Sequence, residues 1–258
     1  MRSSDSLQSE RSSTFPKETL SRFIFEMINP DISLERRRYI VSKASSMPEL
    51  FNAPEMYYET REELMARGLR QATSLSKLCK EERFTDAERR FMLSFFADWT
   101  LAYVQYQFFE KPVELHANDD EKSKLTEKIK NLEITGCYAQ TELGHGSFIR
   151  GIETTASYDA SFGGFVINSP TITSYKWWIG GLGFFTNHVL LIANLRVSGV
   201  SYGPHAFLVQ ILDMKTHEPL PGIMVGDIGP KIGLNATDNG FLKFEYVRVP
   251  KDLSLIHI

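Results

Sequence analysis

The distribution of glycine divides this chain of 258 residues into two parts. Of its 17 glycines, only Gly68 precedes residue 136, whereas residues 1–135 hold 44 of the 61 charged side chains. A glycine-poor and charge-rich segment favours helices with solvated outer faces, because glycine destabilises the interior of a helix. A glycine-rich and charge-poor segment favours short strands joined by tight turns. The two parts are therefore expected to form different kinds of secondary structure.

The first part has the signals of helices. Thr85 and Glu88 have the spacing of a capping box, in which a threonine and a glutamate satisfy the first backbone N–H groups of a helix. A heavy apolar stripe follows at helical spacing, and we expect one helix there that forms the core of the helical domain. The stripe comprises Phe91, Phe95, Trp99 and Ala102.

The second part has the signals of short strands, which are rich in β-branched residues and bounded by turns such as Pro221-Gly222. No helix-length segment separates them, which argues against a parallel, doubly wound sheet. We predict an α+β fold, with an all-α N-terminal domain followed by an antiparallel β-barrel or sandwich. The expected strands are Glu133–Ala139, Ile152–Tyr158, Gly164–Asn168, Thr171–Trp177, His188–Val197, His205–Asp213, Ile223–Gly226 and Phe241–Val249.

Domain boundaries follow from the same division. We predict a flexible polar leader at residues 1–15, a helical domain at 16–132 and a β-domain at 133–252. A net charge of −3 gives no overall basic field for nucleic acid, and no apolar run approaches the roughly 20 residues of a membrane span. The six histidines lack metal-ligand spacing, so no metal site is expected.

The segment from Cys137 to Gly183 is the candidate ligand site. Small polar side chains and glycines in its first part suit the polar edge of a planar heterocycle, and the paired Trp177 and Trp178 suit the face of that ring. We therefore predict a flavin site. Each glycine cluster taken alone is more often a turn, and that alternative stays open. The polar residues are Gln140, Thr141, Glu142, His145 and Ser147.

Four motifs carry a resemblance to a known family. CYAQTELGHGS, KWWIGGLG, DIGPKIG and TDNGFL resemble those of the acyl-CoA oxidases, the flavoenzymes of peroxisomal fatty-acid β-oxidation, and the likeness covers nearly the whole chain. It implies an acyl-CoA dehydrogenase-like fold and FAD as the cofactor. It further implies fatty acyl-CoA and dioxygen as substrates, trans-2-enoyl-CoA and hydrogen peroxide as products, a homodimer, and a peroxisomal location.

The resemblance also implies roles for four residues. Thr141 corresponds to a threonine that bonds the isoalloxazine edge, and Gly180 to a glycine beside the flavin ring, where a side chain would crowd it. Trp178 is expected to pack along the flavin, although a core position in the β-domain is an equally good interpretation. Ser147 matches a serine near the acyl-CoA or the cofactor phosphates.

The chain departs from the family pattern after the β-domain. The family continues into a C-terminal helical region that carries the catalytic glutamate, so we expect no catalytic residue in this chain and no activity of the chain alone. The segment LSLIHI does not continue the family pattern, and residues 253–258 are expected to be a non-native tail. Two alternatives stay open: an acyl-CoA dehydrogenase that passes electrons to a carrier protein, and a non-catalytic truncated binding module.

Overall fold

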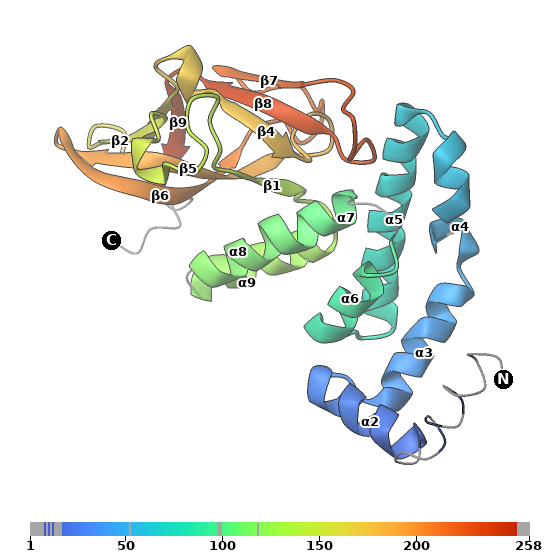
Figure 1. Ribbon diagram of the computed structural model, residues 1–258. Helices are drawn as coiled ribbons and strands as arrows, with labels where there is room; N and C mark the ends of the chain where they lie inside the picture. The colour runs from blue at the N-terminus through green and yellow to red at the C-terminus, as the bar shows by residue number, and fades with distance from the viewer. Residues whose placement is uncertain are drawn as a thin grey trace. The chain divides into compact units, whose positions relative to one another are not determined.

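The computed structural model describes residues 17–51, 53–96, 100–117 and 119–251, together with Gln8, Glu10 and Ser12. Contacts divide the chain into two compact units (Figure 1), the first made of Met1–Ala53 and Cys79–Ala97, the second of Pro54–Leu78 and Asp98–Ile258. The last described helix before the strands ends at Lys130 and the first strand begins at Gly136. The domain boundaries expected from the sequence remain a prediction, and the tail at 253–258 and most of the leader lie outside the described residues.

The first unit consists of helices. The capping box at Thr85 and Glu88 is confirmed, since the Glu88 amide donates to the Thr85 hydroxyl at 3.3 Å and the Thr85 amide to the Glu88 carboxylate at 2.7 Å. The helix that it opens ends at Leu93. The prediction of a single helix through the apolar stripe from Phe91 to Ala102 is therefore wrong. The Ser94 hydroxyl donates to the Phe91 carbonyl at 2.7 Å and competes with the helical backbone. Trp99 lies outside the described residues. The helices are α2 Lys17–Ile28, α3 Leu34–Ser45, α4 Pro48–Phe51 and α6 Asp86–Leu93.

Helices and strands combine in the second unit. Figure 1 shows α8 and α9 side by side next to strands β5 and β6. Their contact with the strands is apolar, since Phe109, Val113 and Ile129 pack with Leu190 and Leu208. The helical elements that lie wholly or mostly in this unit are η1 Ala53–Tyr58, α5 Arg61–Glu81, α7 Leu101–Tyr103, the π-helical η2 Val104–Glu110, α8 Lys111–His116 and α9 Asp119–Lys130.

The described strands form a six-stranded sheet, in the order β1-β5-β2-β3-β9 with β6 paired to β5, and a three-stranded sheet, β4-β8-β7. The expected separation into a helical part and a β-sheet part is confirmed. Short 3₁₀ turns occur at η3 Ile149–Gly151 and η4 Ile172–Ser174. The strands are β1 Gly136–Ala139, β2 Thr155–Asp159, β3 Gly164–Asn168, β4 Lys176–Gly180, β5 His188–Val197, β6 Val200–Gln210, β7 Ile223–Asp227, β8 Asn239–Phe244 and β9 Val247–Pro250.

Three details of the strand prediction are wrong. Pairing is not uniformly antiparallel, because β5 runs parallel to both β1 and β2, and the chain between them supplies the long crossovers that parallel pairs need. The expected strand Phe241–Val249 is split between two sheets, with Tyr246 at the break in a left-handed conformation (φ 52°). The first half of the expected strand Thr171–Trp177 is η4, in which Thr171 and Ser174 cap each other.

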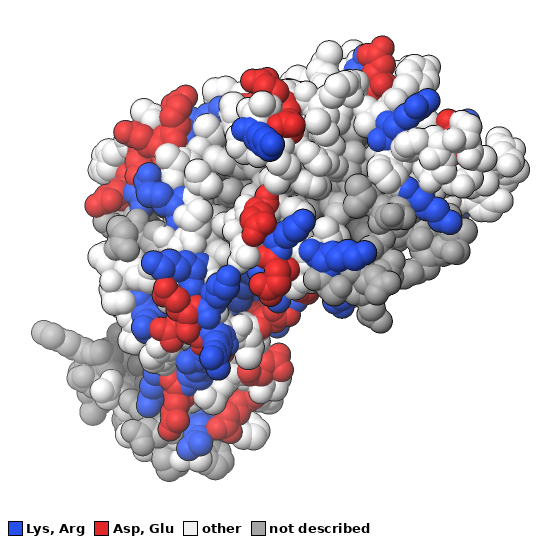
Figure 2. All heavy atoms as spheres, turned by 180° about the vertical axis from the view of Figure 1, so that it is seen from behind, with Lys and Arg blue, Asp and Glu red and all other residues white. Residues whose placement is uncertain are grey.

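The main core lies between the two sheets, where β5 supplies alternate residues such as Val189 and Leu191. Leu190, between them, faces the helices. The strand is therefore buried on both faces, which explains its nearly continuous apolar sequence. Figure 2 shows positive and negative side chains intermingled on the visible face, as the small net charge leads one to expect. Within the described residues, no helix has the length and apolar character needed to cross a membrane.

Candidate functional site

The candidate site is built on a short antiparallel pairing between residues 140–143 and the start of β4. Glu142 and Lys176 form its bridge. The Trp177 amide donates to the Thr141 carbonyl at 3.0 Å, and the Leu143 amide to the Tyr175 carbonyl at 2.8 Å. The two sequence motifs that predicted the site are thus joined by backbone hydrogen bonds.

The inner side of this pairing is a buried ion pair. The Lys176 Nζ lies 3.0 Å from the Glu142 Oε1, and both side chains are 0% exposed. The ammonium also donates to the Gln140 carbonyl at 3.0 Å and the Ile192 carbonyl at 2.8 Å. Burial lowers the pKa of Lys176 to about 8, although the Glu142 carboxylate opposes that shift. An ammonium with three acceptors is fully used as a hydrogen-bond donor.

Thr141 and Trp177 point away from that pair, because successive side chains of a strand alternate between its two faces. Thr141 is exposed and Trp177 half-buried. Regular alternation would then turn Trp178 inward. A β-bulge between Trp177 and Ile179 prevents this, so that Ile179 takes the buried position and Trp178 stays 52% exposed. Bulges commonly re-aim a side chain in this way beside a functional site.

The outward placement of Trp178 requires a strained backbone conformation. Its φ is 68°, in the left-handed region that costs a non-glycine residue roughly 1–2 kcal/mol. The Asn239 amide group donates to the Trp178 carbonyl at 3.0 Å and holds that conformation. The interpretation of Trp178 as a core aromatic is wrong, since about half of its surface faces solvent. A strained, exposed aromatic is a candidate functional residue.

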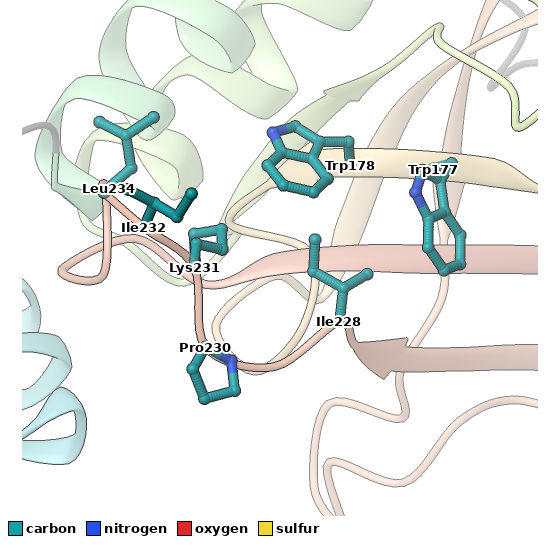
Figure 3. Close-up of a pocket in the computed structure, with 8 residues that line it drawn as sticks. Trp177, Trp178, Ile228, Pro230, Lys231, Ile232 and Leu234 are labelled. Atoms are coloured by element: carbon teal, nitrogen blue, oxygen red, sulfur yellow. The ribbon is translucent and has the colours of Figure 1, made fainter.

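Both tryptophans line one groove of about 570 Å³ (Figure 3). Trp177 is stacked on Phe241, with ring centroids 6.1 Å apart. The opposite wall is the loop after β7, whose apolar side chains include the fully exposed Ile232. This volume suits a small organic ligand. The residues of the loop wall are Ile228, Pro230, Lys231, Ile232, Gly233 and Leu234.

Gly180 and Gly181 have different reasons to be glycine. Gly181 has a φ of 81°, and a Cβ there would lie 2.9 Å from Val104. Gly180 has neither constraint: a Cβ would make ordinary contacts of 3.6 Å with Val104 and Thr237. Within the described residues, neither packing nor backbone conformation demands glycine at position 180.

Buried polar groups support the turn that follows Gly180. The Asp238 carbonyl accepts from the Gly181 amide at 2.6 Å, and the Asp238 carboxylate from the Phe184 amide at 2.6 Å. Burial raises the pKa of Asp238. The Oδ1 atoms of Asp238 and Asn239 are buried without a hydrogen-bond partner among the described residues.

Ser147 lies on the loop that follows residues 140–143 and, like Thr141 and Gly180, does not line the groove. The loop is fastened by His145, whose Nε2 lies 2.8 Å from the Glu153 carboxylate. Thr171 and Thr173 also donate to Glu153, and hydrogen bonds from Thr171 and His145 lower the pKa of that carboxyl. No described residue hydrogen-bonds the exposed Ser147 side chain.

The structure therefore places three of the four predicted site residues on one strand pairing and on strand β4, and Ser147 on the loop that follows residues 140–143. Thr141 and Trp178 lie on adjoining positions of one pairing, and Gly180 ends the same strand. These features fit a flat heterocycle: an exposed hydroxyl at Thr141, an exposed indole face at Trp178 and a missing side chain at Gly180. Sequence reasoning missed Lys176, Asn239 and the loop wall at 228–234. The motifs KWWIGGLG, TDNGFL and DIGPKIG contain Lys176, Asn239 and most of this loop, but the sequence pattern indicated no role for any of them.

Metal ligands are not clustered in the part of the chain that the structure describes. No group of three or more His, Cys, Asp or Glu side chains there could hold a metal ion.

Comparisons with known proteins agree on one family. The family model described as acyl-coenzyme A oxidase N-terminal matches residues 29–135. The acyl-coenzyme A oxidase acox-1.2 of Caenorhabditis elegans is 39% identical over 95% of this chain and 37% of its own length. The peroxisomal acyl-coenzyme A oxidase 1 of Cavia porcellus is 39% identical over 86% of this chain and 34% of its own length.

Solved structures give the same result. The acyl-CoA oxidase-2 of Caenorhabditis elegans, bound with FAD, ascaroside-CoA and ATP, has a TM-score of 0.83 at 38% identity, covering 92% of this chain and 36% of that one. The acyl-CoA oxidase 1 of Arabidopsis thaliana has a TM-score of 0.80 at 35% identity, covering 87% of this chain and 35% of that one. The chain thus spans little more than a third of the length of these relatives.

Proposed function

Because this chain belongs to the acyl-CoA oxidase family, we propose that the protein oxidises fatty acyl-CoA to trans-2-enoyl-CoA with FAD and reduces dioxygen to hydrogen peroxide. The observation that carries this proposal is the outward side of the pairing between residues 140–143 and β4. There the pairing and the strand β4 carry the exposed hydroxyl of Thr141, the exposed indole of Trp178 on a strained backbone, and the unconstrained Gly180. A relative of the same fold is bound with FAD and an acyl-CoA derivative, ascaroside-CoA.

Each residue has a part that its geometry supports. The Thr141 hydroxyl would donate to the polar edge of the isoalloxazine, and the Trp178 ring would pack against it. Gly180 leaves room for the ring, which explains a glycine that the packing of the described residues does not require. Ser147, exposed on its loop, binds the acyl-CoA or a cofactor phosphate through its hydroxyl.

When bound, FAD supplies the redox chemistry: it accepts a hydride equivalent from the acyl β-carbon and delivers two electrons to dioxygen. The chain orients and shields that ring. The groove beside Trp177 and Trp178 is largely apolar, which offers the ring an apolar surface to pack against. We assign the removal of the α-proton to no residue of this chain.

The setting of the enzyme is part of the same proposal. Relatives from Cavia porcellus and Rattus norvegicus are named peroxisomal acyl-coenzyme A oxidases 1 and 2. We place this protein in peroxisomes too, acting as a homodimer. A fluorescent fusion of the complete coding sequence should colocalise with a peroxisomal marker, and light scattering should give twice the mass of one chain.

Peroxide production is the test of the reaction. The protein made from its complete coding sequence, loaded with FAD, should convert palmitoyl-CoA and dioxygen into one hydrogen peroxide per enoyl-CoA. Bleaching of the flavin by palmitoyl-CoA without peroxide would identify a dehydrogenase instead. A flavin that palmitoyl-CoA does not bleach at all would contradict both assignments.

Gly180 separates oxidase from dehydrogenase. Gly180→Thr should slow the reaction of reduced flavin with dioxygen more than it slows reduction by palmitoyl-CoA, because a side chain there crowds the ring. Stopped-flow absorbance measures the two half-reactions separately. An equal fall in both would show that Gly180 does not govern access of dioxygen.

A further inference from the structure

We propose that the buried pair of Glu142 and Lys176 is the positioning unit of the flavin site, which fixes Thr141 and Trp178 relative to each other. The inference rests on the proposed function, since it names what holds the residues of that site in place. Neither side chain reaches the outward face, as both are 0% exposed. They act through the backbone on each side of them.

Lys176 fixes the position of Thr141 by hydrogen bonds to the residues on either side of it. Its Nζ donates to the Gln140 carbonyl at 3.0 Å and to the Glu142 carboxylate at 3.0 Å. Thr141 lies between these two residues, and its own carbonyl accepts from the Trp177 amide at 3.0 Å. The threonine that faces the ligand is thus fixed at three consecutive positions.

Glu142 and Lys176 also anchor this segment to the entry of β2 and to β5. The two carboxylate oxygens of Glu142 accept from the Glu153 amide at 2.8 Å and from the Thr154 amide at 2.9 Å, immediately before β2. Lys176 donates its third bond to the Ile192 carbonyl of β5 at 2.8 Å. One ion pair therefore ties together the Thr141 segment, β4, the entry to β2 and β5.

Trp178 lies two positions after Lys176 and depends on the same anchoring. The bulge puts this residue in a left-handed conformation that its own side chain disfavours. Such a conformation persists only where the surroundings over-determine it. Lys176 fixes the start of β4, and Asn239 fixes the Trp178 carbonyl at 3.0 Å from the other side. Loosening Lys176 removes one of these two supports.

A buried pair is costly to form and costly to break, since removing one partner leaves a charge unpaired in a medium of low polarity. An apolar pair could fill the same space. Unlike an apolar pair, the ion pair fixes its neighbours in specific orientations. Its two side chains make five hydrogen bonds, each with a defined geometry. This is the property that a site needs if its ring contacts are to stay within a fraction of an ångström.

The test uses the protein made from its complete coding sequence, with Glu142→Gln and Lys176→Met. Glu142→Gln keeps the shape of the side chain and remains informative if Lys176→Met does not fold. In the absence of FAD, hydrogen exchange at the Trp177 and Thr154 amides should rise by about tenfold or more in both variants. This readout needs neither cofactor nor substrate.

The FAD-loaded variants give the second readout. The flavin absorption maximum should shift, and kcat with palmitoyl-CoA should fall by about 10- to 100-fold, because small misplacements of a reacting group carry costs of this size. The KM for palmitoyl-CoA should change by less than about threefold, since neither residue contacts substrate. Combining the two substitutions should be no worse than Lys176→Met alone, because the pair acts as one unit.

The matched control is Glu88→Gln, which removes the charge of another buried carboxylate, one paired with Arg36. It should lower thermal stability and leave the flavin spectrum and kcat unchanged. If Glu142→Gln and Lys176→Met also lose only stability, with wild-type exchange at Trp177 and a wild-type spectrum, the pair is merely structural and the proposal is wrong. Failure of the proposed function looks different: wild-type protein that holds FAD and makes no peroxide.

Discussion

The inner and outer sides of one short strand pairing differ in nearly every physical respect. On the inner side, Glu142 and Lys176 are fully buried and all of the lysine's donors have acceptors. On the outer side, Thr141 exposes a hydroxyl that no described residue binds, and Trp178 keeps a strained backbone. Saturated polar groups make a rigid frame, whereas unsatisfied and strained groups mark the surface that meets a ligand.

The comparison predicts that inner substitutions lower stability strongly, whereas outer ones weaken ligand binding with little loss of stability. The largest expected effect is on the inner side. Lys176→Met should lower the free energy of unfolding by about 3–5 kcal/mol, because it leaves the Glu142 carboxylate buried and unpaired. Urea denaturation of apoprotein measures it. Lys243→Met, which removes the half-buried partner of the exposed Glu245, should cost less than about 0.5 kcal/mol. Equal losses at the two lysines would contradict the distinction.

Low pH should also lower stability, through the buried His188 at the start of β5. Burial and the nearby Lys128 charge lower the pKa of His188 to about 4, from an ordinary value of 6.5. Between pH 6.5 and pH 4, His188 is therefore protonated in the unfolded chain and neutral in the folded chain. The free energy of unfolding falls as the pH drops through this range. The loss should approach about 3 kcal/mol, at 1.36 kcal/mol per pKa unit.

Denaturation at pH 7 and at pH 4.5 measures this dependence. His188→Gln should reduce the loss on acidification, whereas His217→Gln, which replaces an exposed histidine, should leave it as in the wild type. An unchanged pH dependence in His188→Gln would show that another group causes the acid sensitivity.

Two threonines offer a matched contrast between the sides. Thr141→Val should weaken FAD binding by about tenfold, the usual worth of one hydrogen bond, and barely affect stability. Thr154→Val should do the reverse, losing about 1–2 kcal/mol of stability because the buried Thr154 hydroxyl donates to the Ser174 carbonyl at 2.9 Å. Fluorescence titration measures the affinity for FAD, and urea denaturation measures the stability. Equal changes in FAD affinity and in stability for the two variants would contradict the distinction between the two sides.

The smallest expected effect isolates the strain at Trp178. Trp178→Gly should be about 1 kcal/mol more stable than Trp178→Ala, since only glycine adopts a left-handed backbone without cost. At Trp177, which has no such conformation, alanine should be the more stable of the two replacements. If alanine is also the better replacement at Trp178, the strain assigned to the bulge is absent.

Local chemistry explains which features the sequence could predict. The glycine and charge distribution correctly separated helices from strands, and the capping box at Thr85 and Glu88 correctly placed a helix start. Short-range patterns also marked the segments that carry Thr141 and Trp178. The parallel pairing of β5 with β1 and β2 was missed, because it depends on contacts about 40–50 residues apart rather than on periodicity.

The frame of the site was harder to predict than its surface. Lysine is almost never fully buried, so the composition of β4 gave no reason to place Lys176 inside. Its partner Glu142 is 34 residues away in sequence. The bulge that turns Trp178 outward arises from the register between β4 and β8, which no local motif records.

The central claim is that the outward side of this pairing binds FAD. Hydrogen–deuterium exchange of the protein made from its complete coding sequence, with and without FAD, tests it most directly. The account predicts that FAD slows exchange in peptides covering residues 140–147 and 176–183, and leaves exchange in β6 unchanged. Protection confined to other segments, with these two unaffected, would contradict it.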